Sequence, residues 1–109
     1  MIVGEKQLET FLVLGLQGRL DTSQAAEVEK KILEILDKGH DRIILDCQEL
    51  DYISSSGLRV FLIAQKKMME KSGVLNICSL QPNIKEIFDI SGFSMIFSIF
   101  PDLESALNT

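Results

Sequence analysis

The sequence predicts a single α/β domain with a mixed, mostly parallel sheet of about five strands and about four helices. Hydrophobic runs of strand length alternate with segments of helical periodicity in the order β-β-α-β-α-β-α-β-α. The 109 residues are 46% hydrophobic, which suits one buried core, and no linker divides them, so residues 1–109 form one domain. Three successive strand–helix–strand units require parallel neighbours, whereas the opening pair of strands can form a hairpin.

The first strands are expected at residues 2–8, 11–16 and 42–47. Nearly every position of 11–16 is apolar, which indicates a strand covered on both faces and therefore central in the sheet. Ile43, Ile44 and Leu45 make a run too short for a helix and bounded by polar turns, as in a buried strand.

The first helix is expected to begin after one of the candidate N-caps Asp21, Thr22 and Ser23 and to end at Gly39. Apolar residues recur between them at helical spacing. They are Ala25, Val28, Ile32, Ile35 and Leu36.

A second helix is expected over residues 56–72, with an apolar stripe facing the core. The stripe comprises Leu58, Phe61, Leu62, Met68 and Met69. Val60 and Ile63 fall on the polar side with Arg59, so they are candidates for exposure and for contact with a protein partner, although scattered exposed apolar residues are also ordinary.

The remaining elements follow from two prolines and a serine–glycine stop. A strand is expected at 74–80, a helix from Pro82 to about Ile90, a strand at 95–100 and a short helix opened by Pro101.

Composition excludes several classes of function. The net charge is −5, from 11 basic and 16 acidic residues spread along the chain, so no footprint for nucleic acid or an anionic membrane is expected. No signal sequence or apolar run of about 20 residues occurs, which favours a soluble cytoplasmic protein. Cys47 and Cys78 are isolated, and we expect buried, reduced thiols.

The most informative stretch places Ser54, Ser55 and Ser56 where a strand gives way to a helix. One serine suffices as an N-cap, so the others are candidates for recognition or modification, although serine-rich turns are also ordinary in loops. Gly57 either lets a partner approach the backbone or relaxes the turn.

Catalytic and metal-binding patterns are weak. A nucleophile elbow needs glycine on both sides of the serine, but Ile53 precedes Ser55, and His40 lies in a different kind of turn, so a small serine hydrolase is a remote alternative. No glycine-rich phosphate loop is present. The acidic residues before the serines fit a solvated turn better than a metal site, so no metal or cofactor is expected. They are Asp46, Glu49 and Asp51.

Three blocks of the sequence resemble the STAS domain of bacterial anti-sigma-factor antagonists. The first runs from Ile43-Ile44-Leu45-Asp46 through Tyr52-Ile53 to Ser54-Ser55-Ser56-Gly57-Leu58. The others are Gly18-Arg19-Leu20-Asp21 and the segment Ile87-Phe88-Asp89-Ile90-Ser91-Gly92-Phe93. Together they span the chain in the family's order, which implies the STAS fold.

The resemblance implies a partner-switching protein without enzymatic activity of its own. In that family, the serine at the position of Ser55 is phosphorylated by an anti-sigma factor that is a serine kinase, and a serine phosphatase reverses this. The unmodified form binds the anti-sigma factor and frees the sigma factor, and the free domain is expected to be monomeric. The family commonly has aspartate where this chain has Ser54, so Ser56 and then Ser54 stand as alternative acceptors.

The expected partner-binding face surrounds the serines and continues along the following helix. It comprises Asp21, Ser54, Ser56, Gly57, Arg59, Val60 and Ile63. Asp21 is also a plain helix cap, and both roles stay open. The alternative function is that of a STAS subunit docking on a transporter or lipid-trafficking complex.

Overall fold

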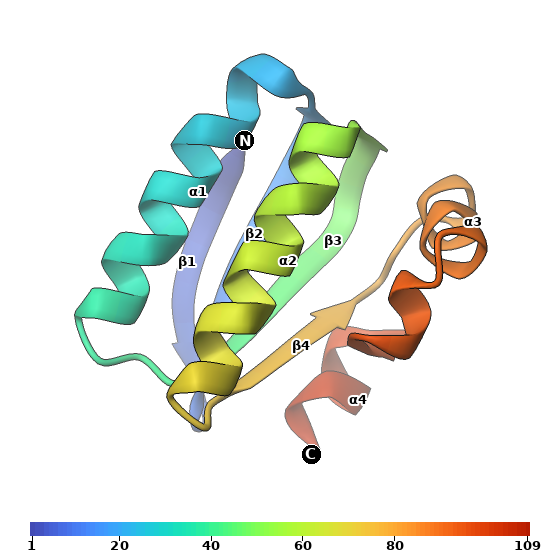
Figure 1. Ribbon diagram of the computed structural model, residues 1–109. Helices are drawn as coiled ribbons and strands as arrows, with labels where there is room; N and C mark the ends of the chain where they lie inside the picture. The colour runs from blue at the N-terminus through green and yellow to red at the C-terminus, as the bar shows by residue number, and fades with distance from the viewer.

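Five strands form one mixed sheet in the computed structural model, which describes residues 1–109 (Figure 1). The strands lie in sequence order: β1 (Ile2–Leu8), β2 (Phe11–Leu20), β3 (Arg42–Ile53), β4 (Val74–Cys78) and β5 (Ser98–Phe100). β1 pairs antiparallel with β2, and all later neighbours are parallel. The predicted fold class and element order are confirmed.

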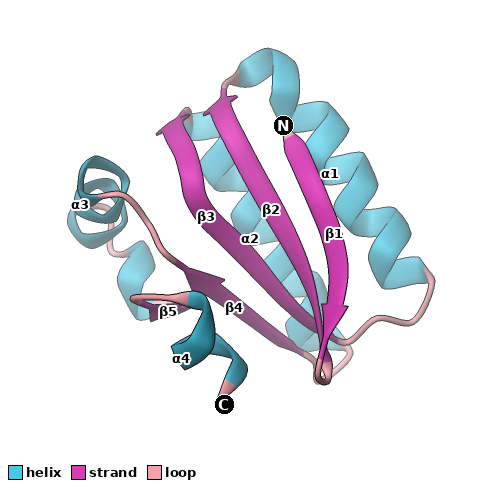
Figure 2. Cartoon of the chain, turned by 180° about the vertical axis from the view of Figure 1, so that it is seen from behind, coloured by secondary structure: helices cyan, strands magenta, loops and turns pink.

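The helices cover the sheet unequally. α1 (Thr22–Asp37) and α2 (Ser55–Glu70) lie side by side on one face (Figure 1). α3 (Pro82–Ile90) follows β4, and α4 (Leu103–Leu107) lies on the opposite face of the sheet (Figure 2). A 3-10 turn, η1 (Phe93–Met95), joins α3 to the last strand.

Side chains from alternate positions of the central strands fill two separate cores. Leu12 and Leu14 of β2 join the main core under α1 and α2, whereas Phe11 and Val13 join a smaller one under α4. β2 is therefore buried on both faces, as its sequence predicted. Burial of each large apolar side chain contributes roughly 1.5–3 kcal/mol relative to exposure, so both cores matter to stability.

Both cysteines are buried free thiols, as expected. Burial raises the pKa of Cys78 to about 12 and lifts the pKa of Cys47 well above its ordinary value. Both thiols therefore stay protonated, which suits their role as small apolar side chains.

β2 and β3 run further than the sequence predicted. The expected acidic turn after residue 47 is the second half of β3, which continues to Ile53 and contains two register shifts against β2. Each shift inserts an extra residue in β3, so Leu50 and Ile53 return to the core while Glu49 and Asp51 face solvent. An extra residue breaks the period-two pattern of a strand, and this hid the extension.

The prediction also overran the strands near the C-terminus. β4 ends at Cys78, and the expected strand at 95–100 is only β5, because the chain first forms η1. Phe97 packs edge to face on Phe61, with ring centroids 6.3 Å apart, and Phe93 contacts Phe88 at 6.0 Å. This aromatic cluster holds the segment in a compact turn instead of an extended strand.

Asn76 of β4 is the one buried polar residue and fastens the C-terminal segment to the sheet. Its Nδ2 donates to the Ala106 carbonyl at 3.0 Å and to Thr109 Oγ1 at 2.9 Å. Arg42 stacks over the Phe11 ring and donates to the Thr109 carbonyl at 3.2 Å. These contacts fix α4 over the smaller core.

We expect Asn76→Asp to lower the free energy of unfolding by about 2–3 kcal/mol at pH 7, because it removes both donors and buries a charge. Burial raises the carboxyl pKa in the folded state, so the loss should grow as pH rises above about 4. Urea denaturation at pH 4 and pH 7 measures it. Asn108→Asp, at an exposed position, is the control, and equal losses in the two variants would contradict this role for Asn76.

Candidate functional site

The serine loop joins the end of β3 to the start of α2, and Ser54 is the N-cap of α2. Ser54 Oγ accepts from the Gly57 N–H at 3.1 Å and donates to the Leu20 carbonyl at 3.1 Å. The Ser54 N–H donates to the same carbonyl at 2.9 Å. The Ser54 hydroxyl thus both donates and accepts a hydrogen bond, and it ties the start of α2 to the end of β2.

Gly57 is required by close packing at this junction. A Cβ at this position would lie 2.8 Å from Ile53 Cγ1 and 2.9 Å from the Leu20 carbonyl oxygen. Neither interpretation of Gly57 gave this reason, since the φ angle of Gly57 is not positive and it is Leu20 and Ile53 of the protein itself that approach its backbone. Gly57 is buried, so the expectation that it contacts a partner is corrected.

Ser55 and Ser56 differ in their surroundings. Ser56 is half-buried, and its hydroxyl lies 3.4 Å from Thr22 Oγ1 at the start of α1. Ser55 is exposed at the first position of α2, and its hydroxyl takes part in no hydrogen bond of the protein. Of the three hydroxyls, only that of Ser55 is both exposed and uncommitted.

The N-terminus of α1 lies beside that of α2 (Figure 1). Asp21 caps α1 by accepting from the Gln24 N–H at 3.1 Å, and it also accepts from Ser23 Oγ at 2.7 Å. The hydrogen bonds from Ser23 and Gln24 hold the pKa of Asp21 below its usual value. Asp21 is therefore an ionised cap at the same end of the molecule as Ser55.

The exposed side of α2 differs from the prediction. Val60 was expected to be exposed but is 2% exposed, and Met69 was expected in the core but is 68% exposed. The buried face comprises Gly57, Val60, Phe61, Ala64 and Met68. The apolar pattern gave no weight to Gly57 and Ala64, and the observed buried face is turned by roughly a quarter of the helix circumference from the predicted stripe. Val60 is therefore removed from the candidate partner face.

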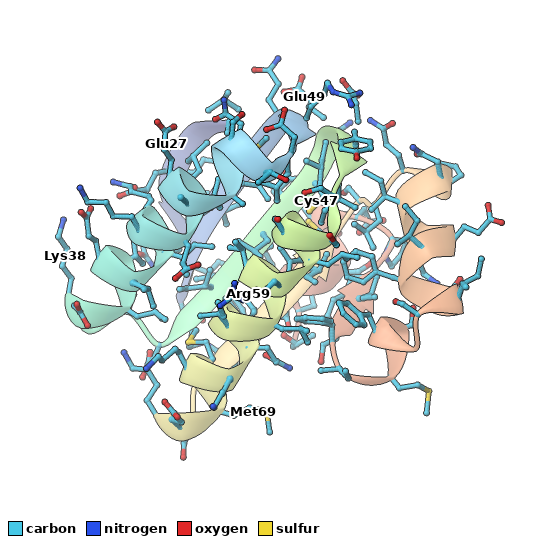
Figure 3. The ribbon with its side chains drawn as sticks, turned by 45° about the horizontal axis from the view of Figure 1, so that its top comes forward. Glu27, Lys38, Cys47, Glu49, Arg59 and Met69 are labelled. Carbon is cyan, nitrogen blue, oxygen red and sulfur yellow. The ribbon has the colours of Figure 1, made fainter.

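The other candidates on α2 are accessible to different degrees. Arg59 is exposed and lies on the outward side of the helix (Figure 3), whereas Ile63 is half-buried. Together with Ser55, Leu62 and Lys66, Arg59 forms a stripe opposite the buried face.

Sequence reasoning missed the contacts that hold the loops together. Arg19 of β2 stacks on the Tyr52 ring of β3, with its Cζ 4.1 Å from the ring centroid, and these two residues are partners in the parallel ladder. Thr22 was considered only as a helix cap, and its contact with Ser56 was not predicted. The Arg19–Tyr52 and Thr22–Ser56 contacts both depend on the register of β2 against β3, which the bulges conceal from the sequence.

Topology separates Ser55 from His40, the pair that the serine hydrolase alternative would need. His40 precedes β3 and Ser55 follows it, so the length of the strand separates the two side chains. The His40 carbonyl instead accepts from Lys71 Nζ at 3.2 Å, at the far end of α2. No cluster of three or more potential metal ligands occurs, and no helix has the length and hydrophobicity to cross a membrane.

Comparison with known proteins identifies the family to which this chain belongs. Residues 5–106 match the family model of the STAS domain. The chain belongs to the STAS domain family.

Relatives of this STAS domain include BtrV of Bordetella bronchiseptica, which is named as an anti-sigma factor antagonist. It is 39% identical over 92% of this chain and 86% of its own length. The anti-sigma-B factor antagonist of Bacillus subtilis is 30% identical over 89% of this chain and 88% of its own length.

The Bacillus protein SpoIIAA, solved in its phosphorylated form, aligns with 96% of this chain and 96% of its own at a TM-score of 0.76. At 20% identity it shares the fold.

We expect Gly57→Ala to destabilise this STAS domain by about 2 kcal/mol, because the new methyl group collides with the Leu20 backbone and outweighs the better helix propensity of alanine. Gly4→Ala is the matched control, since no atom lies within 4 Å of the added carbon there, and it should change stability by less than about 0.5 kcal/mol. Urea denaturation measures both. Unchanged stability of the Gly57→Ala variant would contradict the close approach of Leu20 and Ile53 to this position.

We expect Asp21→Asn to make the protein less sensitive to acid. The folded-state pKa of Asp21 is depressed, so its contribution is present above the unfolded-state pKa and is lost as pH falls through the folded-state value. Asparagine caps a helix equally well but does not titrate. Urea midpoints between pH 7 and pH 2.5 should therefore fall less in the variant than in the wild type, and parallel profiles would argue against the cap.

Proposed function

We propose that this STAS domain is an anti-sigma-factor antagonist that binds an anti-sigma factor in its unmodified form and is released when Ser55 is phosphorylated. The observation that carries the proposal is the free, exposed hydroxyl of Ser55 between two committed serines. The names of the two relatives support the choice of partner.

The proposed reaction needs no catalytic group from the STAS domain itself. A serine kinase, proposed to be the anti-sigma factor, transfers the γ-phosphoryl group of ATP to Ser55 Oγ, which loses its proton, and ADP leaves. A serine phosphatase hydrolyses the ester and restores the hydroxyl. The chain is then a regulatory substrate and not an enzyme, acting in the cytoplasm where ATP is supplied.

The position of Ser55 lets one group act on binding without unfolding the domain. A phosphate adds roughly −1.5 to −2 charges, which the unpaired N–H groups of the first turn of α2 tolerate. A partner that covers the same surface must bury that charge, which costs several kcal/mol unless it is paired. Ser54 and Ser56 are weaker acceptors, because modification of either breaks a contact to β2 or α1.

The proposed partner face contains the accessible members of the predicted set. They are Asp21, Ser54, Ser56, Arg59 and Ile63, and the proposed acceptor Ser55 lies among them. Gly57 and Val60 support this face from below. We propose that the free domain is monomeric and uses this face for the anti-sigma factor.

We expect Ser55→Asp to weaken binding to the anti-sigma factor kinase of the same organism by at least about tenfold, or roughly 1.4 kcal/mol. Ser55→Ala should bind like the wild type but accept no phosphate. Isothermal titration and mass spectrometry after incubation with kinase and ATP measure the two properties. Ser98→Asp, at an exposed serine of β5, is the charge control.

Undiminished binding of Ser55→Asp, or phosphate found on another residue, would overturn the proposal. Tight binding to a membrane transporter by modified and unmodified protein alike would favour the docking alternative.

A further inference from the structure

Arg59 is an arginine without a partner. Arg42 donates to Thr10 Oγ1 and to the Thr109 carbonyl, and Arg19 lies over the Tyr52 ring. Arg59 is exposed, and no ion pair, hydrogen bond or ring contact in the protein involves its guanidinium. Figure 3 shows it on the outward side of α2. Its charge is therefore available.

Arg59 lies four residues after Ser55 on the same helix. Residues at this spacing are neighbours on the helix surface, with roughly 5–6 Å between their Cβ atoms, and an anion that precedes a cation is the favoured order. Both residues belong to the outward stripe of α2. A phosphate on Ser55 would therefore stand beside the arginine side chain, and rotation of that side chain suffices to bring them together.

No carboxylate competes for Arg59 along its own helix. Residues 55–69 include no acidic side chain, and Glu70 lies 3.9 Å from Lys67. On the neighbouring elements, α1 included, no carboxylate forms an ion pair with Arg59, and Asp21 at the start of α1 is held by Ser23 and Gln24. Formation of a phosphate contact would cost Arg59 no existing ion pair.

We propose that Arg59 clamps the phosphate of Ser55 through its guanidinium fork, an inference that rests on the proposed phosphorylation of Ser55. Two parallel N–H donors match two phosphate oxygens, and such charge-assisted pairs are stronger than neutral hydrogen bonds. Phosphorylation then changes the partner face in two ways. It adds negative charge at Ser55, and it withdraws the Arg59 guanidinium from the surface that the unmodified domain offers to the anti-sigma factor.

The test uses the full chain with phosphoserine incorporated at position 55 during synthesis, so it needs no kinase. A ³¹P NMR titration reports the second pKa of the phosphate, which lies near 6 in the absence of neighbours. The clamp should lower this pKa by about 0.5 relative to the Arg59→Gln variant, a modest shift because the site is exposed. Arg59→Lys, which keeps the charge but loses the fork, should give an intermediate value.

Lys66→Gln is the matched control, because Lys66 lies on the same outward stripe but eleven residues from Ser55, roughly 16 Å along the helix. It should leave the phosphate pKa unchanged. Equal values in the wild type and Arg59→Gln would overturn the clamp, and so would equal effects of Arg59→Gln and Lys66→Gln, which would indicate only a general positive field.

The two proposals fail separately. Mass spectrometry of the wild type after treatment with kinase and ATP decides whether Ser55 is the natural acceptor. The NMR titration decides whether Arg59 receives the phosphate once it is present, whatever the kinase does.

Discussion

The Leu20 carbonyl is the point on which the arrangement of the site depends. It accepts both the backbone N–H and the hydroxyl of Ser54, and it leaves no room for a side chain at Gly57. These contacts join the last residue of β2 to the first turn of α2. Because Asp21, the cap of α1, follows Leu20 directly, the same junction determines where both helices begin. The two bulges of β3 add residues to this strand, and with them Ile53 pairs with Leu20 at the junction.

The junction also explains why three adjacent serines are not equivalent. Ser54 must both accept and donate, which a hydroxyl can do and an ionised carboxylate cannot. An aspartate at position 54 could cap α2 but could not donate to the Leu20 carbonyl. Ser56 faces α1, and Ser55 faces solvent. The distinction among acceptors therefore comes from helix geometry and not from the residue type.

The sequence sufficed for the element order, the mixed sheet, the double burial of β2 and the buried thiols, because each rests on local periodicity or composition. The prediction failed where an inserted residue changes the period-two pattern of a strand or where small residues form part of the buried face of a helix. The bulges made half of β3 look like a turn, and Gly57 and Ala64 concealed the true buried face of α2. The position of Ser55 on a helix start was predictable, but its free hydroxyl was not, since that depends on what Leu20 and Thr22 do from distant parts of the chain.

A switch of this kind works because the energies of folding and of binding respond differently to one group. The hydroxyl of Ser55 contributes no hydrogen bond to the fold, and a negative charge at a helix N-terminus is favourable by roughly 0.3–1 kcal/mol. The same charge beneath a partner has no water to solvate it, and the penalty is several kcal/mol per ion. On the proposed function, the domain is therefore expected to keep its fold when it is modified, while the complex is expected to lose at least about tenfold in affinity. A clamp by Arg59 strengthens this asymmetry, because the pair it forms is satisfied within the free domain and leaves the partner without the cation it would otherwise meet.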